Sequence, residues 1–430
     1  MNLLAGYRAC AQREVSTRYV DVLDGVRAIA IFIVAWYHIW QQSWLRAYIH
    51  IESTGQTILN IEPMVRSGYI MVDVMLLISG FLLFLPYARR MVEGGPKPSA
   101  KEFYVRRALR ILPTYYFSVF VVLIGFALPS RGFRMDAVLW KDLWTHLTFT
   151  HVFFFETYVA TELNVVLWTL AIEVQFYLIF PLVAWAFSKR PMITWAVLIA
   201  AGLAFRQFVV LQQADSSMYV NQLPAFLDVY ANGMLAAICY VHLARALKHD
   251  RWTRLAGTAL AVVMVLAIWQ LILVHSRSGS FEMIRRNQAH YRFLLSVYVC
   301  VFMLAAAHAG GGLRYLLSNK LMRFFAAISF HYYIWHQFIA AKMRSEWRFP
   351  PSDYLMPNEA GDRPWQWLFT ICAFLFPLLL SAMLTYGFER PITQMGLQAW
   401  DRRKKRRMKN RTDKKSNQES NQESNGGLPA

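Results

Sequence analysis

The sequence predicts an all-α integral membrane protein, a polytopic bundle of about ten transmembrane helices with both ends of the chain in the cytoplasm. Three observations lead to this prediction. Hydrophobic residues make up 56% of the 430 residues, whereas soluble proteins have roughly 45–50%. They gather in segments of about 20 residues, the length that a helix needs to cross the hydrocarbon core of a bilayer. Lys and Arg are enriched in the connections on one side of these segments, which indicates the cytoplasmic side.

The apolar segments divide the chain into three regions. A cytoplasmic N-terminal segment is expected at 1–23, a membrane domain at 24–395 and a basic, low-complexity, disordered cytoplasmic tail at 396–430. The membrane spans are expected at 24–44, 67–88, 107–128, 166–187, 191–211, 223–244, 255–275, 291–309, 322–342 and 365–389. The longest connection, 130–165, contains aromatic residues that suggest a helix at the membrane surface, and its His146 and His151 are expected to be solvated.

The net charge of +19 comes largely from the tail run RRKKRRMKNRTDKK at 402–415. Such a run can bind nucleic acid or anionic lipid. A topology anchor followed by a solvated tail is the preferred explanation, so no nucleic-acid partner is expected.

Several ionisable residues lie inside the apolar segments, where charge is costly and a functional role is the first hypothesis. At a rise of about 1.5 Å per residue, five of them fall at one depth, slightly outside the midplane. They are His38, Asp73, Glu173, Asp228 and His336. Because they come from five different helices, we expect them to share one polar chamber. Histidine exchanges protons near neutral pH, which makes His38 the candidate general base.

A second group of charges is expected near the cytoplasmic surface. Arg27 lies eleven residues before His38, almost three turns of helix, so both side chains share one helix face. Arg107 and Arg110, in YVRRALRILPTYY, are three residues apart and also share a face. Arginine holds phosphate through paired hydrogen bonds. These three arginines are therefore suited to an anion that arrives from the cytoplasm.

These residues stand in motifs that resemble those of the membrane acyltransferase type 3 family. Arg27 and His38 match its Arg-x10-His element. Four further stretches are similar to family elements and occur in the family's order: GYIMVDVMLLISGFLLF (68–84), RRALRILPTYY (106–116), LWTLAIEVQFYLIFPL (167–182) and AISFHYYIWHQFI (327–339). The resemblance covers about residues 20–395. It departs from the family at Thr169, where serine is usual, and at His331, for which the sequence suggests no role.

The resemblance implies an O-acyltransferase of the cell (bacterial cytoplasmic) membrane. Such an enzyme takes an acyl group, often acetyl, from cytoplasmic acyl-coenzyme A and transfers it to a hydroxyl of a cell-surface or lipid-linked glycan. The phosphates of the donor would lie at Arg27, Arg107 and Arg110, and the long pantetheine arm would reach inward to His38.

The remaining polar residues are given roles on the same scheme. Glu173 or Asp73 would orient the imidazole of His38, as a carboxylate does in a catalytic triad. His336 and Asp228 are candidates for binding the acceptor. No metal is expected, because His331 and His336 are five residues apart and not the four that place two histidines on one face of a helix.

Two other functions fit part of the pattern. A proton-coupled secondary transporter would use the same layer of histidines and carboxylates. However, the two halves of the sequence show no convincing inverted repeat, and proton coupling does not require the cytoplasmic arginines. A structural or regulatory membrane scaffold is the other alternative, but it does not explain why the polar residues lie at one depth.

Overall fold

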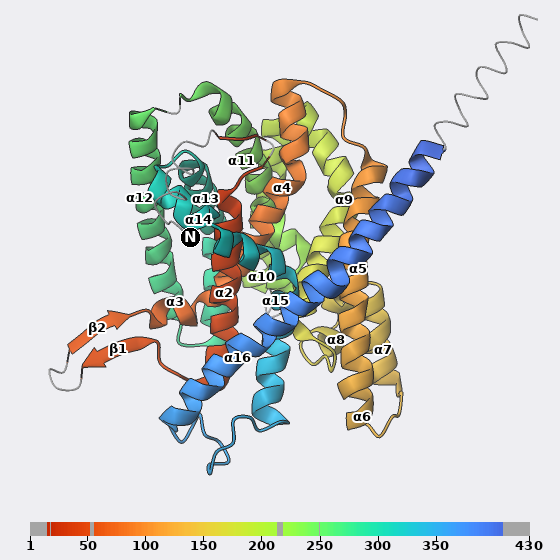
Figure 1. The fold of residues 1–430 in the computed structure, drawn as a ribbon, viewed down its shortest axis with the longest axis vertical. Helices are drawn as coiled ribbons and strands as arrows, with labels where there is room; N and C mark the ends of the chain where they lie inside the picture. Colours follow the sequence, from red (N-terminus) through yellow and green to blue (C-terminus); the bar gives the residue numbers. More distant parts are fainter. Residues whose placement is uncertain (1–14, 18, 52–55, 213–217, 249, 407–430) are drawn as a thin grey trace, which may run out of the picture.

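A computed structural model describes residues 15–17, 19–51, 56–212, 218–248 and 250–406. Within these residues the chain is predominantly helical, and strands occur only in one antiparallel hairpin, β1 (Tyr48–Ile51) with β2 (Gln56–Asn60). The helices pack side by side as a single bundle (Figure 1). The prediction of an all-α polytopic membrane protein is confirmed.

Fifteen helices are described along the chain. In chain order they are α2 (Val22–Ser43), α3 (Glu62–Arg66), α4 (Met71–Glu93), α5 (Ala100–Val122), α6 (Leu128–Ser130), α7 (Ala137–Leu147), α8 (Phe155–Tyr158), α9 (Trp168–Lys189), α10 (Pro191–Gln212), α11 (Leu227–Ala246), α12 (Arg251–Ser276), α13 (Phe281–Ala307), α14 (Gly311–Ser318), α15 (Lys320–Ser345) and α16 (Arg363–Leu384).

Among the described residues, nine helical stretches are long and apolar enough to cross a membrane, and they coincide with nine of the ten expected spans. The remaining expected span is α15, which forms one unbroken helix of 26 residues but is not among the nine. It packs against α2 and α16, so much of its surface faces protein and can carry polar residues without exposing them to lipid. The chain is a multi-pass membrane protein.

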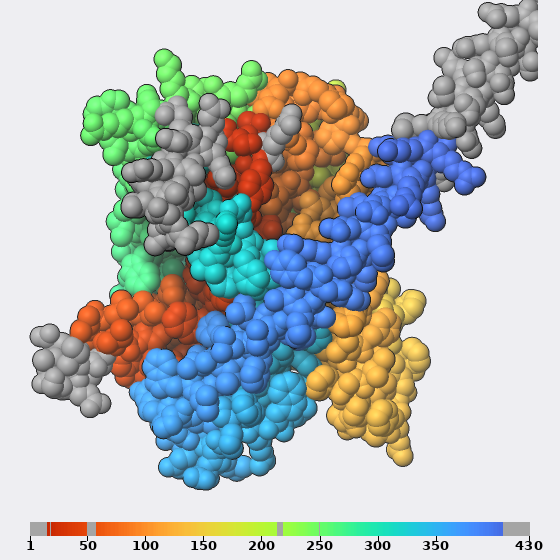
Figure 2. Space-filling model, viewed as in Figure 1, coloured from red at the N-terminus to blue at the C-terminus, as the bar shows by residue number. Residues whose placement is uncertain are grey.

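The two ends of the bundle differ. The connection between α4 and α5 lies at the end where α2 begins, and this end is called the arginine end below. The β-hairpin, α7 and α8 lie at the opposite end, called the loop end (Figure 1). From α16 the helix continues to Arg406 and crosses one face of the molecule toward the arginine end (Figure 2). Most of the expected disordered tail, 407–430, lies outside the described residues.

Helices α4 and α11 form the closest helix pair in the centre of the bundle. A Cβ at Gly233 would lie 2.4 Å from the carbonyl oxygen of Leu77, and one at Gly80 would lie 2.8 Å from the carbonyl oxygen of Tyr230. Small residues let membrane helices approach each other, so this pair of glycines fixes α4 beside α11. The position of α4 matters because this helix lines the candidate active site.

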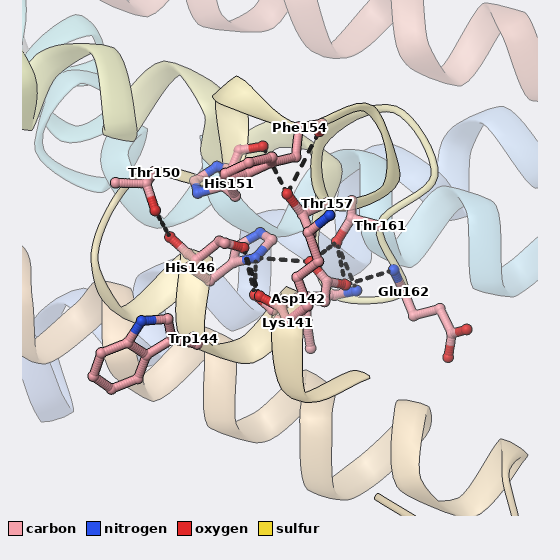
Figure 3. Close-up of polar contacts among 12 residues, drawn as sticks. Lys141, Asp142, Trp144, His146, Thr150, His151, Phe154, Thr157, Thr161 and Glu162 are labelled. Carbon is pink, nitrogen blue, oxygen red and sulfur yellow. Dashed lines mark hydrogen bonds and ion pairs between the residues drawn. The ribbon is translucent and has the colours of Figure 1, made fainter. Parts of the chain in front are cut away.

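The 130–165 connection folds into a compact cap that includes α7 and α8 (Figure 3). Nδ1 of His146 lies 2.9 Å from the carbonyl oxygen of Asp142 and 3.0 Å from its carboxylate. That carboxylate accepts from the Thr161 hydroxyl at 2.8 Å and the Glu162 N–H at 3.0 Å. The rings of His146 and His151 stack 3.9 Å apart. The expectation that both histidines are solvated is wrong, because their side chains are buried in this cap.

Tyrosines of α5 and a glutamine of α9 fasten the cap to the bundle. Tyr115 donates to the carbonyl of His146 at 2.9 Å, and Tyr116 donates to that of Leu147 at 3.0 Å. Gln175 donates to the carbonyl of Phe149 at 3.0 Å. Burial and the neighbouring His146 hold the pKa of His151 well below its usual value, so the imidazole of His151 is neutral at physiological pH.

Candidate active site

A cavity of about 110 Å³ runs between α2, α4, α5, α9 and α15. Arg27, Arg107 and Arg110 line it toward the arginine end, together with Glu173. Apolar side chains, mostly of α4, form much of the remaining wall. The cavity is therefore a narrow passage, charged at one end, within the membrane-spanning part of the bundle. We call it the central pocket.

The three arginines leave positive charge without a protein partner. None of them forms an ion pair with a carboxylate within the described residues, and Glu173 is the only acidic residue that lines the same pocket. The guanidinium of Arg107 instead lies 5.6 Å from the centre of the Tyr177 ring, a contact that holds its orientation. Three cations and one carboxylate in a narrow, partly apolar space favour a bound anion.

Two histidines meet beside the pocket. Nδ1 of His38, on α2, lies 2.8 Å from Nε2 of His336, on α15. Nδ1 of His336 lies 3.0 Å from the carbonyl oxygen of Tyr332, which can only accept a hydrogen bond. A neutral His336 therefore carries its proton on Nδ1 and accepts at Nε2. It follows that His38 donates from Nδ1 and keeps a free lone pair on Nε2.

The histidine pair adjoins the central pocket through Tyr333. This tyrosine lines the pocket, and its ring centre lies 5.7 Å from that of His336. Arg27 and His38 lie about 16 Å apart along α2, as their spacing in the sequence requires. The structure thus places the histidine pair next to a residue that lines the pocket, whereas the three arginines line the pocket itself.

Asp73 and Asp228 take part in a separate group of charges. Asp73 accepts from Nε of Arg292 at 3.2 Å, and Asp228 receives two hydrogen bonds from Arg206, at 2.6 and 2.7 Å. Both arginines also donate to the carbonyl oxygen of Ala225. All four side chains are buried, and together they link α4, α10, α11 and α13.

Sequence reasoning named the two aspartates of this group and missed their partners. Arg206 and Arg292 both lie within expected spans, and a buried carboxylate in a membrane requires a positive partner. This requirement could have led from the two aspartates to Arg206 and Arg292 in the sequence. His331 is also buried, with Nε2 at 3.4 Å from a carboxylate oxygen of Glu389. Among the described residues, no three His, Cys, Asp or Glu side chains are grouped so that they could hold a metal ion.

Comparison with known proteins identifies the family. A family model described as an acyltransferase domain matches residues 20–387. The chain belongs to this acyltransferase family. The match spans all the helices that line the central pocket, and both ends of the pocket lie within it.

Curated relatives of this acyltransferase chain carry names that state an activity. A peptidoglycan O-acetyltransferase, OatA, of Listeria monocytogenes is 30% identical over 198 residues, which are 44% of this chain and 28% of the relative. A putative peptidoglycan O-acetyltransferase, YrhL, of Bacillus subtilis is 23% identical over 90% of this chain and 57% of its own length. The O-acetyltransferase OatA of Staphylococcus aureus is 25% identical over 90% of this chain and 60% of its own.

The chain therefore spans at most about three fifths of the length of these relatives. No solved structure matches it at a significant level.

Proposed function

We propose that the protein is a membrane O-acyltransferase. It takes an acyl group, most simply acetyl, from cytoplasmic acyl-coenzyme A and transfers it to a hydroxyl of a cell-surface or lipid-linked glycan. The observation that carries the proposal is a pocket lined by three arginines, with a hydrogen-bonded pair of histidines beside its lining residue Tyr333. The names of the relatives support acetyl as the acyl group and a glycan as the acceptor. A proton-coupled transporter is not favoured, because these relatives are named as acetyltransferases.

The arginines bind the donor. On this proposal the arginine end faces the cytoplasm, and Arg27, Arg107 and Arg110 hold phosphate oxygens of coenzyme A. Glu173 limits the excess positive charge of the group. The pantetheine arm extends along the apolar wall toward Tyr333, which brings the thioester to the histidine pair. The acceptor hydroxyl approaches from the other side of the membrane.

His38 is the general base. Its Nε2 removes the proton from the acceptor hydroxyl as the oxygen attacks the thioester carbonyl. When the carbon–sulfur bond breaks, the same proton passes to the thiolate of coenzyme A, so the ester and the free thiol are the only products. The sequence suggested that Glu173 or Asp73 orients His38. We assign that positioning role to His336, because His336 is the side chain in hydrogen-bond contact with His38.

The experiment is donor turnover by the purified protein, comparing the wild type with His38→Ala, Arg27→Ala and His290→Ala. His290 is an exposed histidine at the start of α13 and serves as the matched control. His38→Ala should lower kcat by about 10²–10⁴-fold, the usual contribution of a general base. Arg27→Ala should chiefly raise the KM for acetyl-coenzyme A, and His290→Ala should behave as wild type. Full turnover by a folded His38→Ala protein would refute the assignment.

A further inference from the structure

Two larger cavities open from the central pocket at the arginine end. One, of about 910 Å³, lies between α4, α5 and the connection 94–99, and it shares Leu82, Arg107 and Arg110 with the pocket. We call it the α4–α5 cleft. The other, of about 520 Å³, lies beside α15 and the helix that continues from α16, and it shares Arg27 and Arg110 with the pocket. We call it the α15–α16 cleft. A donor bound in the pocket can leave its nucleotide in only one of them.

We propose that the α4–α5 cleft holds the 3′-phosphorylated nucleotide of the coenzyme A donor, with Arg89 and Lys97 on the 3′-phosphate. This inference rests on the proposed function and names a part of the donor site that neither the motifs nor the relatives' names indicate. Three observations support it: the shape of α4, the charge of the two clefts, and the state of Arg89.

One face of α4 lines the central pocket and the α4–α5 cleft without a break. The residues of this face are Val72, Met75, Ser79, Leu82, Pro86, Arg89 and Glu93. They alternate at intervals of three and four residues, so they form one stripe along the helix, about 32 Å in length. The stripe is largely apolar as far as Pro86 and charged from Arg89 onward. This order matches a donor that has a slender, weakly polar arm and a highly charged nucleotide.

Charge distinguishes the two clefts. Apart from the arginines shared with the pocket, the α15–α16 cleft has two cations and two carboxylates: Arg323, Arg390, Asp24 and Glu389. The α4–α5 cleft has five cations and two carboxylates: Arg89, Arg90, Lys97, Arg106, Lys404, Glu93 and Glu102. Coenzyme A carries several negative charges at neutral pH. The α4–α5 cleft has the larger excess of positive charge and therefore attracts the nucleotide more strongly than the α15–α16 cleft does.

Arg89 and Lys97 are the cations of the cleft that are best placed to bind phosphate. Nε of Arg89 is buried and has no hydrogen-bond partner among the described residues. Arg106, in contrast, is already paired with Glu102 at 2.7 Å. Lys97 is exposed on the connection that leads into α5. The first turn of α5 begins at Ala100, so the positive end of its dipole lies at the same place.

The test compares coenzyme A with dephospho-coenzyme A, which lacks only the 3′-phosphate. The full-length protein is reconstituted in nanodiscs of uncharged lipid, and the Kd of each ligand is measured by titration calorimetry. Wild type should bind coenzyme A more tightly. Arg89→Gln and Lys97→Gln should each reduce the ratio of the two Kd values about tenfold, the effect of losing one charged hydrogen bond. Arg323→Gln, in the other cleft, is the matched control and should keep the wild-type ratio.

The outcomes that would overturn the inference can be told apart. If Arg323→Gln lowers the ratio and the two α4–α5 variants do not, the nucleotide lies in the α15–α16 cleft and the inference is wrong. Because Lys97 is exposed, Lys97→Gln should fold. The test therefore stays decisive even if Arg89→Gln fails to fold. Variants that keep the ratio in the nanodiscs but no longer retain phosphatidylglycerol when first purified in detergent would show a lipid phosphate in the cleft, which also overturns the inference. Failure of the proposed function looks different, because wild type would then bind neither ligand.

Discussion

Replacing Asp228 with asparagine removes one charge from a buried ion pair while keeping the size of the side chain. In the wild type, Arg206 directs two hydrogen bonds to this carboxylate, at 2.6 and 2.7 Å. The two side chains are 2% and 0% exposed, so water cannot replace the missing charge. The variant leaves the guanidinium of Arg206 buried without its anionic partner. The same pair joins α10 to the start of α11.

The expected loss follows from burial. Breaking a buried ion pair by removing one partner costs about 3–5 kcal/mol of unfolding free energy. The matched control is the exposed pair of Arg286 and Glu282, at 3.2 Å and with side chains 59% and 70% exposed. An exposed pair contributes about 0–1 kcal/mol, so Glu282→Gln should be close to neutral. Removing both buried partners, with Arg206→Met and Asp228→Leu together, should recover much of the loss, because no unpaired charge remains.

The assay is reversible unfolding in detergent or bicelles, or thermal denaturation where unfolding is irreversible, with transfer activity measured below the transition. The sequence suggested that Asp228 binds the acceptor. The assay distinguishes that role from a structural role in the ion pair. A structural ion pair predicts a large loss of stability in Asp228→Asn. If the variant keeps the stability of wild type and loses transfer, the reasoning from burial is refuted and Asp228 belongs to the acceptor site.

Three further predictions concern packing, pH and the cap. Gly233→Ala should lower the unfolding free energy by about 1–3 kcal/mol, because its Cβ would lie 2.4 Å from a backbone carbonyl oxygen of α4. The control is Gly125→Ala, because a Cβ at Gly125 would meet no atom within 4 Å. Equal stability of the two variants would contradict this packing. The pKa of His151 is lowered in the folded cap, so the unfolded cap takes up a proton first as the pH falls below about 6.5. Stability is then present at neutral pH and lost on acidification; limited proteolysis of 137–158 should increase toward pH 5 in wild type and much less in His151→Phe. Tyr115→Phe removes one buried hydrogen bond to the cap and should cost about 1 kcal/mol, seen as faster hydrogen exchange in α7, and unchanged exchange would show that this bond does not hold the cap.

Much of this protein could be predicted from the order of its residues. Apolar segments of the right length predict membrane spans because a helix rises by a fixed amount per residue. The same rule places His38 and His336 at one depth, and in the structure the two side chains are in contact. The motif residues Arg27, Arg107 and Arg110 could be grouped for the same reason, and they do line one pocket.

What the sequence could not give was the partner of each buried charge. Depth along a helix follows from residue number, but the rotation of each helix and the identity of its neighbours depend on how all the helices pack. His38, Asp73, Glu173 and Asp228 were therefore expected in one chamber, whereas packing divides them. His38 meets His336, Glu173 joins the arginines, and the two aspartates pair with Arg292 and Arg206.

The sequence by itself determined the membrane class of this protein, the approximate depth of its polar residues and the family to which it belongs, because these depend on composition, spacing and motif. Only the tertiary structure decided which of those residues touch. Side-chain contacts require two helices to present matching faces at the same height, and that condition is set by packing through small residues such as Gly80 and Gly233.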